Sequence, residues 1–197
     1  DVALAIELFT EGSLNTFAKP TNVDTSSRIL CYDIRDLGKQ LQPVGMLVVL
    51  DSVFNRIIRN RKLGKSTWVY IDEIYLLFQH EYSANFLFTL WKRVRKYGAC
   101  CTGLTQNVDD LLQSHTARTM LANSEFLVML NQAATDRAEL ANLLNISDNQ
   151  LSYITNVDSG RGLIKCGSAI VPFMNSFPKN RLYQLMTTRP SETMAAA

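Results

Sequence analysis

The sequence predicts an α/β protein with three layers, in which a mostly parallel sheet lies between helices. The first observation is that short apolar, strand-like runs alternate along the chain with segments of helical periodicity. The second is that the runs at 99–105 (ACCTGLT) and 126–130 are mostly apolar, which is typical of strands buried on both faces. With 47% hydrophobic and 19% charged residues, the 197-residue chain has the composition of an ordinary globular core. We expect one domain over residues 1–190 and a loose tail over 191–197.

The first elements follow from local signals. Residues 28–34 (RILCYDI) predict a strand, after a short helix and a polar loop over residues 1–27. Pro43 suits the first turn of a helix, so a long helix is predicted over about 44–61, with Gly64 at its stop. Residues 68–71 then predict the next strand.

The second half continues the alternation. Ser83 is expected to cap a helix that runs to Tyr97, and Gly98 suits the end of that helix. Ser147 and Gln150 form a capping-box pattern at the start of a short helix. The other predicted elements are a strand at 99–105, a helix at 108–121, a strand at 126–130, a helix at 136–144 and a closing β-hairpin at 160–173 around Gly167.

The stretch KLGKSTWVYIDEIYLLF, residues 62–78, contains what looks like the end of a phosphate-binding loop. A P-loop has the spacing GxxxxGK[ST] and opens a helix directly after its lysine. Here Arg59 stands five positions before Gly64, and the residues that follow are strand-like. We therefore interpret Gly64 as a helix stop and Lys65–Ser66 as a link into the strand. No GxxxxGK[ST] occurs elsewhere in the 197 residues.

Charge and cysteine usage exclude few functions. The net charge of +2 is too small to indicate nucleic-acid binding by itself. A local basic stretch without acids, residues 56–65, is interpreted as a solvated helix end in preference to a DNA-contacting patch. Four cysteines have no metal-ligand spacing and suit a reducing cytoplasm. We expect no signal peptide and no membrane span, because no apolar run approaches the length that a span needs.

Two groups of polar residues end neighbouring predicted strands. Asp72 and Glu73 end the strand at 68–71, and Thr105–Gln106 ends the next one. Open α/β sheets bind ligands at this carboxyl edge. In a P-loop ATPase the first acid holds Mg²⁺, the second orients or deprotonates the attacking water, and a side-chain amide on the next strand lies beside the γ-phosphate. Taken singly, an acidic pair or a polar strand end is also common in loops without such a role.

Together these residues resemble a known family. The segments WVYIDEIYLLF, LWKRVRKYGACCTGLTQNVDDLL, FLVMLNQ, LLNISDNQLSYI and GRGLIKCGSAIVPF are similar to the C-terminal motor domain of the conjugative-transfer ATPases. These ATPases are the fourth VirB component of bacterial type IV secretion systems and belong to the HerA–FtsK group of P-loop ATPases. The resemblance covers roughly residues 28–190. It implies a RecA-like P-loop ATPase fold, here without its first strand and P-loop.

The resemblance also implies roles and partners. Asp72 and Glu73 match the Walker B acids, with Asp72 holding Mg²⁺ through water. Gln106 matches the sensor glutamine, Arg95 matches an arginine finger, and Arg161 in SGRG matches a later motif of less defined role. The implied cofactors are ATP and Mg²⁺, the implied assembly is a ring such as a hexamer, and further partners are other secretion components and DNA. The implied place is the cytoplasmic face of the membrane.

Three alternatives stay open at this point: a coupling protein, an FtsK-like DNA translocase, and a RecA-like module that scaffolds partners without catalysis. Because no Walker A motif occurs in the 197 residues, this chain alone is not expected to bind ATP tightly or to hydrolyse it.

Overall fold

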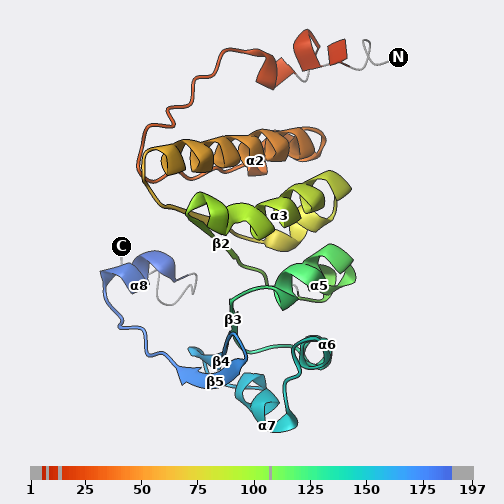
Figure 1. The fold of residues 1–197 in the computed structure, drawn as a ribbon, viewed down its shortest axis with the longest axis vertical. Helices are drawn as coiled ribbons and strands as arrows, with labels where there is room; N and C mark the ends of the chain where they lie inside the picture. The colour runs from red at the N-terminus through yellow and green to blue at the C-terminus, as the bar shows by residue number, and fades with distance from the viewer. Residues whose placement is uncertain (1–5, 8, 13–14, 107, 188–197) are drawn as a thin grey trace. The chain divides into compact units, whose positions relative to one another are not determined.

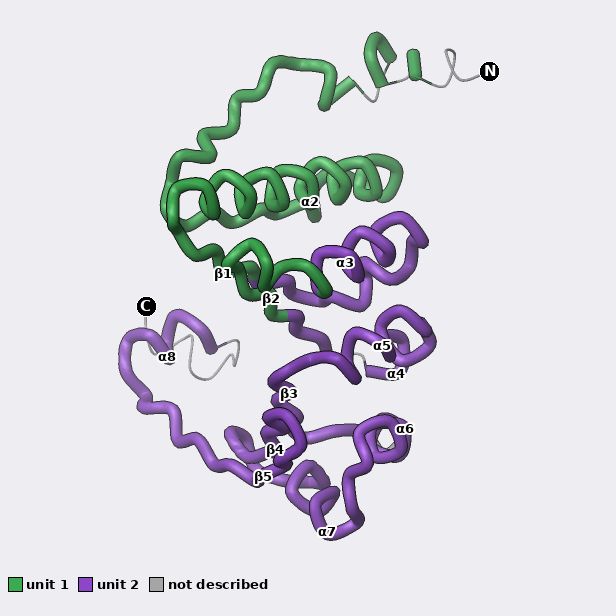
Figure 2. Tube along the Cα trace, viewed as in Figure 1, with its two compact units in different colours: residues 1–69, 92–102 green, residues 70–91, 103–197 purple. Residues whose placement is uncertain are grey.

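The structure is a computed structural model that describes residues 6–7, 9–12, 15–106 and 108–187. The chain divides into two compact units (Figure 2). Unit 1 comprises residues 1–69 and 92–102, and unit 2 comprises residues 70–91 and 103–197. The predicted tail at 191–197 lies outside the described residues.

Unit 1 is built around the long helix α2, Gly38–Lys62 (Figure 1). It also contains the 3₁₀ helices η1 (Asn15–Ala18), η2 (Arg35–Leu37) and η4 (Val94–Tyr97). Helix α2 buries Leu41, Leu50 and Ile57. It begins earlier than predicted and contains Pro43 near its start. Pro43 is the sixth residue of the helix and does not stand in its first turn as predicted, so the helix lacks the N–H that would bond to the carbonyl of Lys39.

The end of α2 explains the residues that imitate a P-loop. Gly64 has φ +67°, and its N–H donates to the carbonyl of Arg61 at 3.0 Å. The N–H of Lys65 donates to the carbonyl of Asn60 at 2.9 Å. These two bonds define a Schellman motif, in which a left-handed glycine ends a helix and satisfies its last carbonyls. The prediction of Gly64 as a helix stop is confirmed.

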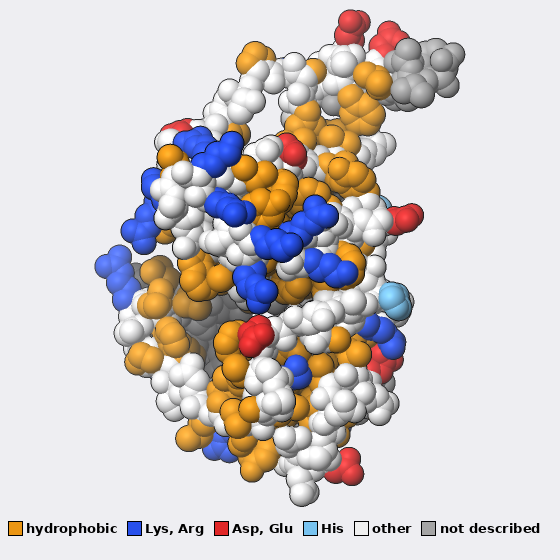
Figure 3. Space-filling model, viewed as in Figure 1, with side chains coloured by type: hydrophobic (Ala, Val, Ile, Leu, Met, Phe, Trp, Pro, Cys, Tyr) orange, Lys and Arg blue, Asp and Glu red, His pale blue; other side chains and the backbone are white. Residues whose placement is uncertain are grey.

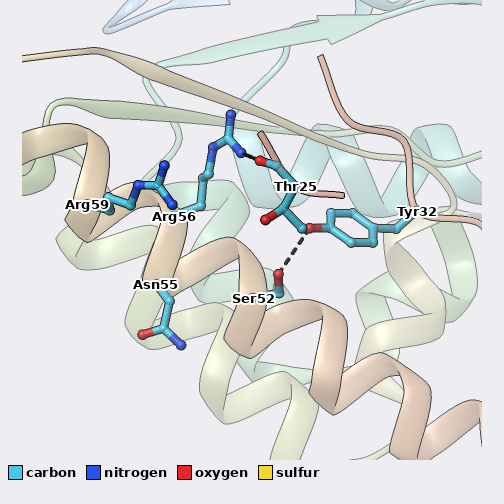
Figure 4. Close-up of a pocket in the computed structure, with 6 residues that line it drawn as sticks. All are labelled: Thr25, Tyr32, Ser52, Asn55, Arg56 and Arg59. Atoms are coloured by element: carbon cyan, nitrogen blue, oxygen red, sulfur yellow. Dashed lines mark hydrogen bonds between the residues drawn. The ribbon is translucent and has the colours of Figure 1, made fainter. Parts of the chain in front are cut away.

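The strand predicted at 28–34 is wrong. This segment has no regular strand structure, and polar contacts attach it and the residues before it to α2. The hydroxyl of Tyr32 lies 3.0 Å from Oγ of Ser52 (Figure 4), and Arg56 donates to the carbonyl of Ser27 at 2.7 Å. A strand needs a neighbour that pairs with its backbone N–H and C=O groups, and within the described residues neither small sheet includes this segment.

The expectation about membrane-length helices also needs correction. The helical stretch Arg35–Lys62 has the length and mean hydropathy of a segment that could cross a membrane. The same stretch carries Pro43 and Asp51 and buries Leu50 and Ile57 inside unit 1. The core helix of a protein outside a membrane has these properties too.

A small parallel sheet pairs β1 (Thr67–Ile71) with β2 (Ala99–Gly103). The N–H of Thr67 donates to the carbonyl of Gly98 at 3.4 Å, before β2 begins. At the other end the N–H of Leu104 donates to the carbonyl of Ile71 at 2.8 Å, so the two strands run in the same direction. The boundary between the units in the sequence passes through both strands.

Burial on both faces was predicted for the strands at 99–105 and 126–130 and is wrong for both, since Phe126 and Val128 in the second are 66% and 60% exposed. Exposure alternates along β1 and varies along β2, where Cys100 and Thr102 are exposed. On β1, Trp68 and Tyr70 are 65% and 67% exposed. One face of these strands is therefore uncovered, although their composition is that of buried strands.

Unit 2 contains most of the shorter helices. Ser83 was predicted to cap α3, but it is the third residue of that helix and is buried at 2% exposure. Its hydroxyl donates to the carbonyls of Leu77 and His80. Ser114 divides the predicted helix at 108–121 in two, because its side chain caps the second piece by accepting from the N–H of Ala117. The helices are η3 (Ile74–Phe78), α3 (Glu81–Arg93, whose last two residues are in unit 1), α4 (Val108–Gln113), α5 (His115–Ala122), α6 (Ala134–Leu144), α7 (Asp148–Leu151), η5 (Ser152–Ile154) and α8 (Arg181–Met186).

A second sheet in unit 2 has the order β3–β4–β5 and is antiparallel. Its strands are β3 (Phe126–Met129), β4 (Arg161–Cys166) and β5 (Ala169–Met174). The hairpin around Gly167 and the capping box of Ser147 are confirmed. The α/β class is confirmed as well. A single, mostly parallel sheet is not, since the described strands form two small sheets, and β3 pairs with the returning hairpin.

The core of unit 2 joins this sheet to the helices. Ile154 and Leu163 are fully buried, and Leu112 is 1% exposed. The other buried members of this cluster are Val108, Met129, Leu140, Leu144 and Ile146. The core therefore fixes α4, which follows directly after the Gln106 loop.

Candidate active site

Backbone hydrogen bonds place the two predicted groups of polar residues side by side in unit 2. The N–H of Leu104 donates to the carbonyl of Ile71 at 2.8 Å, and the N–H of Ile74 donates to the carbonyl of Leu104 at 2.9 Å. These bonds fix the residues after β1 against the residues after β2. Asp72 and Glu73 therefore face the Gln106 loop, as their positions at neighbouring strand ends predicted.

Glu73 has an unusual backbone conformation, with φ 47° and ψ 49°. For a residue other than glycine, the left-handed backbone conformation costs about 1 kcal/mol or more. The Asp72 side chain supports this turn, because its Oδ1 accepts from the N–H of Glu73 at 3.0 Å. Asp72 itself is exposed. The two adjacent carboxylates thus have different surroundings.

The carboxylate of Glu73 contacts Gln106 directly. Nε2 of Gln106 donates to Oε1 of Glu73 at 3.2 Å. The second carboxylate oxygen, Oε2, is buried and has no hydrogen-bond partner among the described residues. A buried acceptor without a partner is costly and rare in folded proteins, so a donor such as a water molecule would fit this oxygen.

The loop at Gly103 has little space for a side chain. A Cβ added to Gly103 would lie 2.5 Å from Cδ1 of Ile74. The close approach of these two loops therefore depends on a glycine immediately before Leu104. This packing keeps the Gln106 loop beside Glu73.

The carboxylates of Asp72 and Glu73 fit the part of a nucleotide site that holds the metal ion and the attacking water. Asp72 offers an exposed carboxylate, and Glu73 offers an unpaired carboxylate oxygen. In the part of the chain that the structure describes, no three His, Cys, Asp or Glu side chains gather as a metal cage. The two carboxylates suit Mg²⁺, which keeps several waters and uses one or two carboxylates together with phosphate oxygens. The sequence has no GxxxxGK[ST] loop that would hold those phosphates.

The two candidate arginines have different surroundings. Arg95 is exposed in η4 of unit 1. Arg161 starts β4 in unit 2, and its guanidinium pairs with the carboxylate of Asp158 at 3.7 Å. Among the described residues of unit 2, hydrogen bonds join Glu73 to Asp72 and to Gln106.

Two glycines position Arg161. Gly160 has φ +85°, and its carbonyl accepts from the N–H of Asn175 at 2.7 Å. A Cβ on Gly162 would lie 2.2 Å from the carbonyl oxygen of Met129. These restrictions explain why glycine stands on both sides of Arg161 in the SGRG segment.

Sequence reasoning missed two features of this site. The left-handed conformation of Glu73 has no sequence signal, because it occurs at a residue that is neither glycine nor asparagine. The Glu73–Gln106 hydrogen bond could be expected only as proximity, since strand ends do not specify rotamers.

Comparisons with known proteins give the fold and the family. No curated protein matches the chain as a relative. The solved structure of VirB4 from Thermoanaerobacter pseudethanolicus is similar, with a TM-score of 0.79 and 24% sequence identity. The match covers 92% of this chain and 50% of that chain, so this chain spans half the length of the VirB4 structure. A family model described as the TraG P-loop domain matches residues 21–163. The chain therefore belongs to the TraG P-loop domain family.

Proposed function

We propose that this chain is the water-activating part of an ATPase motor in a bacterial type IV secretion or conjugative DNA-transfer system. In the intact protein, ATP hydrolysis would drive assembly of the channel or movement of a substrate through it. The observation that carries the proposal is the hydrogen bond from Gln106 to Glu73, with Asp72 beside it. Membership of a P-loop family and the VirB4-like fold support it.

Each residue has a distinct proposed role. Asp72 holds Mg²⁺ through a water ligand. Glu73 accepts a proton from the attacking water at Oε2, the oxygen that has no partner. Gln106 holds Oε1 and thereby sets the direction in which Oε2 points. When bound, Mg²⁺–ATP supplies the phosphoryl group that water attacks and the charge that polarises it.

Arg95 and Arg161 are proposed to stabilise the negative charge that develops on the phosphate during ATP hydrolysis. Both guanidiniums are exposed, and neither is engaged by the Asp72–Glu73 pair. We assign Arg95 to the ATP of a neighbouring subunit in a ring. Arg161 lies between two glycines that position it. We assign it to stabilising the same negative charge on the phosphate.

The intact protein is proposed to work as a ring at the cytoplasmic face of the membrane. Other secretion components, and DNA as transported substrate, would be its partners. Membership of the TraG P-loop domain family and the VirB4-like fold support these assignments.

The Gln106→Glu variant of the intact protein tests the carrying observation. A second carboxylate 3.2 Å from Glu73 opposes the charged form that accepts a proton. We expect turnover to fall, and the acid-side loss of activity to begin at a higher pH than in the parent. The matched control is Gln113→Glu on α4, which is exposed and should leave the profile unchanged. An unchanged pH profile in Gln106→Glu would contradict the assignment of Glu73 as the base.

A further inference from the structure

We propose that Asn131 is a positioning residue, which holds the loop before Arg161, residues 155–160, and thereby sets where the guanidinium of Arg161 lies. The task of Arg161 at the phosphate rests on the proposed function, whereas the attachment of the loop rests on contacts within unit 2. Asn131 belongs to the segment FLVMLNQ, residues 126–132, whose two polar residues take no part in the proposed hydrolysis.

The pairing of β3 with β4 brings Asn131 close to the start of β4. The two strands are antiparallel neighbours (Figure 1), and Met129 at the end of β3 pairs with Leu163. The same register, continued by two residues, places Asn131 opposite Arg161. Strand β3 ends at Met129, before that point. The polar groups that follow the strand can therefore bond to the loop.

Two hydrogen bonds attach the loop to this end of β3. The N–H of Gln132 donates to the carbonyl of Ile154 at 3.0 Å, and Oδ1 of Asn131 accepts from the N–H of Val157 at 3.4 Å. Ile154 is fully buried in the core of unit 2, so the first bond fixes the residue from which the loop starts. The second bond fixes the middle of the loop.

The loop needs partners outside itself because its backbone is irregular. Asn156 and Gly160 have positive φ, 50° and 85°, and a chain that bends in this way leaves backbone N–H groups without the partners of a regular ladder. Val157 comes directly after the first bend, and Asn131 supplies its acceptor. After the second bend, the carbonyl of Gly160 accepts from the N–H of Asn175 at 2.7 Å.

The ion pair of Arg161 does not fix the arginine by itself. Its partner is Asp158, at 3.7 Å, and the two side chains are 51% and 82% exposed. Ion pairs between exposed side chains contribute little. Asp158 also belongs to the loop, so its own position depends on the same attachments. The bond from Asn131 is the attachment that a side-chain substitution can remove.

A purely structural role for Asn131 predicts a different outcome from a positioning role. Asn131 is exposed and makes one long hydrogen bond to the loop, so its removal should leave unit 2 folded. A displacement of about 1 Å at a group that acts on the substrate can nevertheless lower the rate about 10²-fold. A positioning role therefore predicts a loss of turnover that depends on the presence of Arg161.

The attachment of the loop is tested in the 197-residue chain without nucleotide, by amide hydrogen exchange followed by NMR. Asn131→Ala removes the acceptor and should speed exchange of the Val157 N–H about fivefold or more. The Gln132 N–H should keep its protection. Asn131→Asp keeps an acceptor oxygen and should keep the protection of Val157. Unchanged exchange of Val157 in Asn131→Ala would overturn the proposal.

The consequence for catalysis is tested by steady-state ATPase kinetics of the intact protein. Asn131→Ala should lower kcat roughly tenfold and leave the KM for ATP within about twofold of the parent. The matched control is Asn142→Ala, which replaces an exposed asparagine on α6 and should change neither constant. In an Arg161→Ala background, Asn131→Ala should lower kcat by less than about twofold further, because the group through which it acts is absent.

Two kinds of failure can be told apart. If Arg161→Ala is impaired but Asn131→Ala is not, or if Asn131→Ala lowers kcat by the same factor in both backgrounds, Asn131 does not act through Arg161 and the inference is overturned. If Arg161→Ala turns over at the parent rate, the role of Arg161 in the proposed function is wrong, and the catalytic consequence inferred for Asn131 is wrong with it. Exchange at Val157 then decides the attachment of the loop alone.

Discussion

Gln106 and Glu73 are 33 positions apart in the sequence, and their side chains meet, with Nε2 of the amide 3.2 Å from Oε1 of the carboxylate. This contact leaves Oε2 of Glu73 buried and without a partner among the described residues. It joins two loops that follow parallel strands, the arrangement in which α/β proteins place ligands.

The 197-residue chain alone should bind Mg²⁺–ATP weakly. A P-loop supplies the backbone amides and the lysine that bind the β- and γ-phosphates. In this chain the backbone N–H groups of Gly64 and Lys65 donate to the last carbonyls of α2 and so are not available to phosphates. Titration of labelled ATP with Mg²⁺ into the purified chain checks this expectation. Micromolar affinity would mean that another segment cradles the phosphates.

Arg95 should act on the ATP of a neighbouring subunit. Arginine fingers contribute about 10³-fold or more to phosphoryl transfer, so Arg95→Ala should nearly abolish turnover in the intact protein. Mixing Arg95→Ala protomers with Glu73→Gln protomers would form some interfaces that have both an intact Glu73 and an intact Arg95. We expect partial recovery of ATPase activity in the mixture. If the mixture assembles normally and stays inactive, Arg95 is not a finger in trans.

Gly162→Ala should destabilise unit 2 strongly. A Cβ at this position lies 2.2 Å from the carbonyl oxygen of Met129, in the β3–β4 pairing that positions Arg161. We expect a loss of several kcal/mol in unfolding free energy, measured by urea denaturation. Gly38→Ala is the control, because a Cβ there meets nothing within 4 Å and only the backbone conformation of Gly38, φ 68° and ψ 160°, opposes it. That variant should cost about 1–3 kcal/mol, and equal costs in the two variants would contradict the packing described.

Cys101 should alkylate far more slowly than Cys100. Burial disfavours the thiolate and raises the pKa of Cys101 from 9.0 to about 12, and the neighbouring Cys100 adds to this shift. Near neutral pH the reactive thiolate of Cys101 is then roughly a thousandfold rarer than that of an ordinary cysteine. Cys100 is exposed. Iodoacetamide labelling followed by mass spectrometry should modify Cys100 first, and labelling of both at one rate would contradict this burial.

Local signals predicted much of the secondary structure. Gly64 and Gly98 stop their helices with positive φ, and Ser147 forms the expected capping box with Gln150. The hairpin around Gly167 also forms. These features depend on neighbouring residues only, which is why the sequence was sufficient to predict them.

Features that depend on distant partners were harder to predict. The apolar run at 28–34 is typical of a strand, but its polar groups bond to α2. Ser83 was predicted to cap a helix, but its hydroxyl donates to the carbonyls of Leu77 and His80 in the preceding segment. At the candidate site, the residues 72, 73 and 106 could be identified from strand ends, whereas the conformation of Glu73 and its contact with Gln106 required the fold.

The distribution of charge shows a related limit. The sequence indicated one basic stretch, at 56–65, and the contacts of Tyr97 with Phe54 and Arg61 place the second, at 92–96, beside it in unit 1. Figure 3 shows lysine and arginine side chains gathered on one face, over α2 and the segment beside it. A net charge of +2 cannot reveal such an asymmetry. Charge counted by structural unit is therefore more informative here than charge counted by chain.

The central claim is that Glu73 activates water while Asp72 holds the metal. Glu73→Gln keeps the shape of the side chain and its contact with Gln106 but cannot take up a proton, so the loss falls on the chemical step. The most direct measurement compares single-turnover hydrolysis and Mg²⁺-dependent ATP binding in Glu73→Gln and Asp72→Asn forms of the intact protein. The account predicts that Glu73→Gln binds ATP normally without hydrolysing it, whereas Asp72→Asn loses Mg²⁺-dependent affinity. Normal hydrolysis by Glu73→Gln, or loss of affinity alone in both variants, would contradict it.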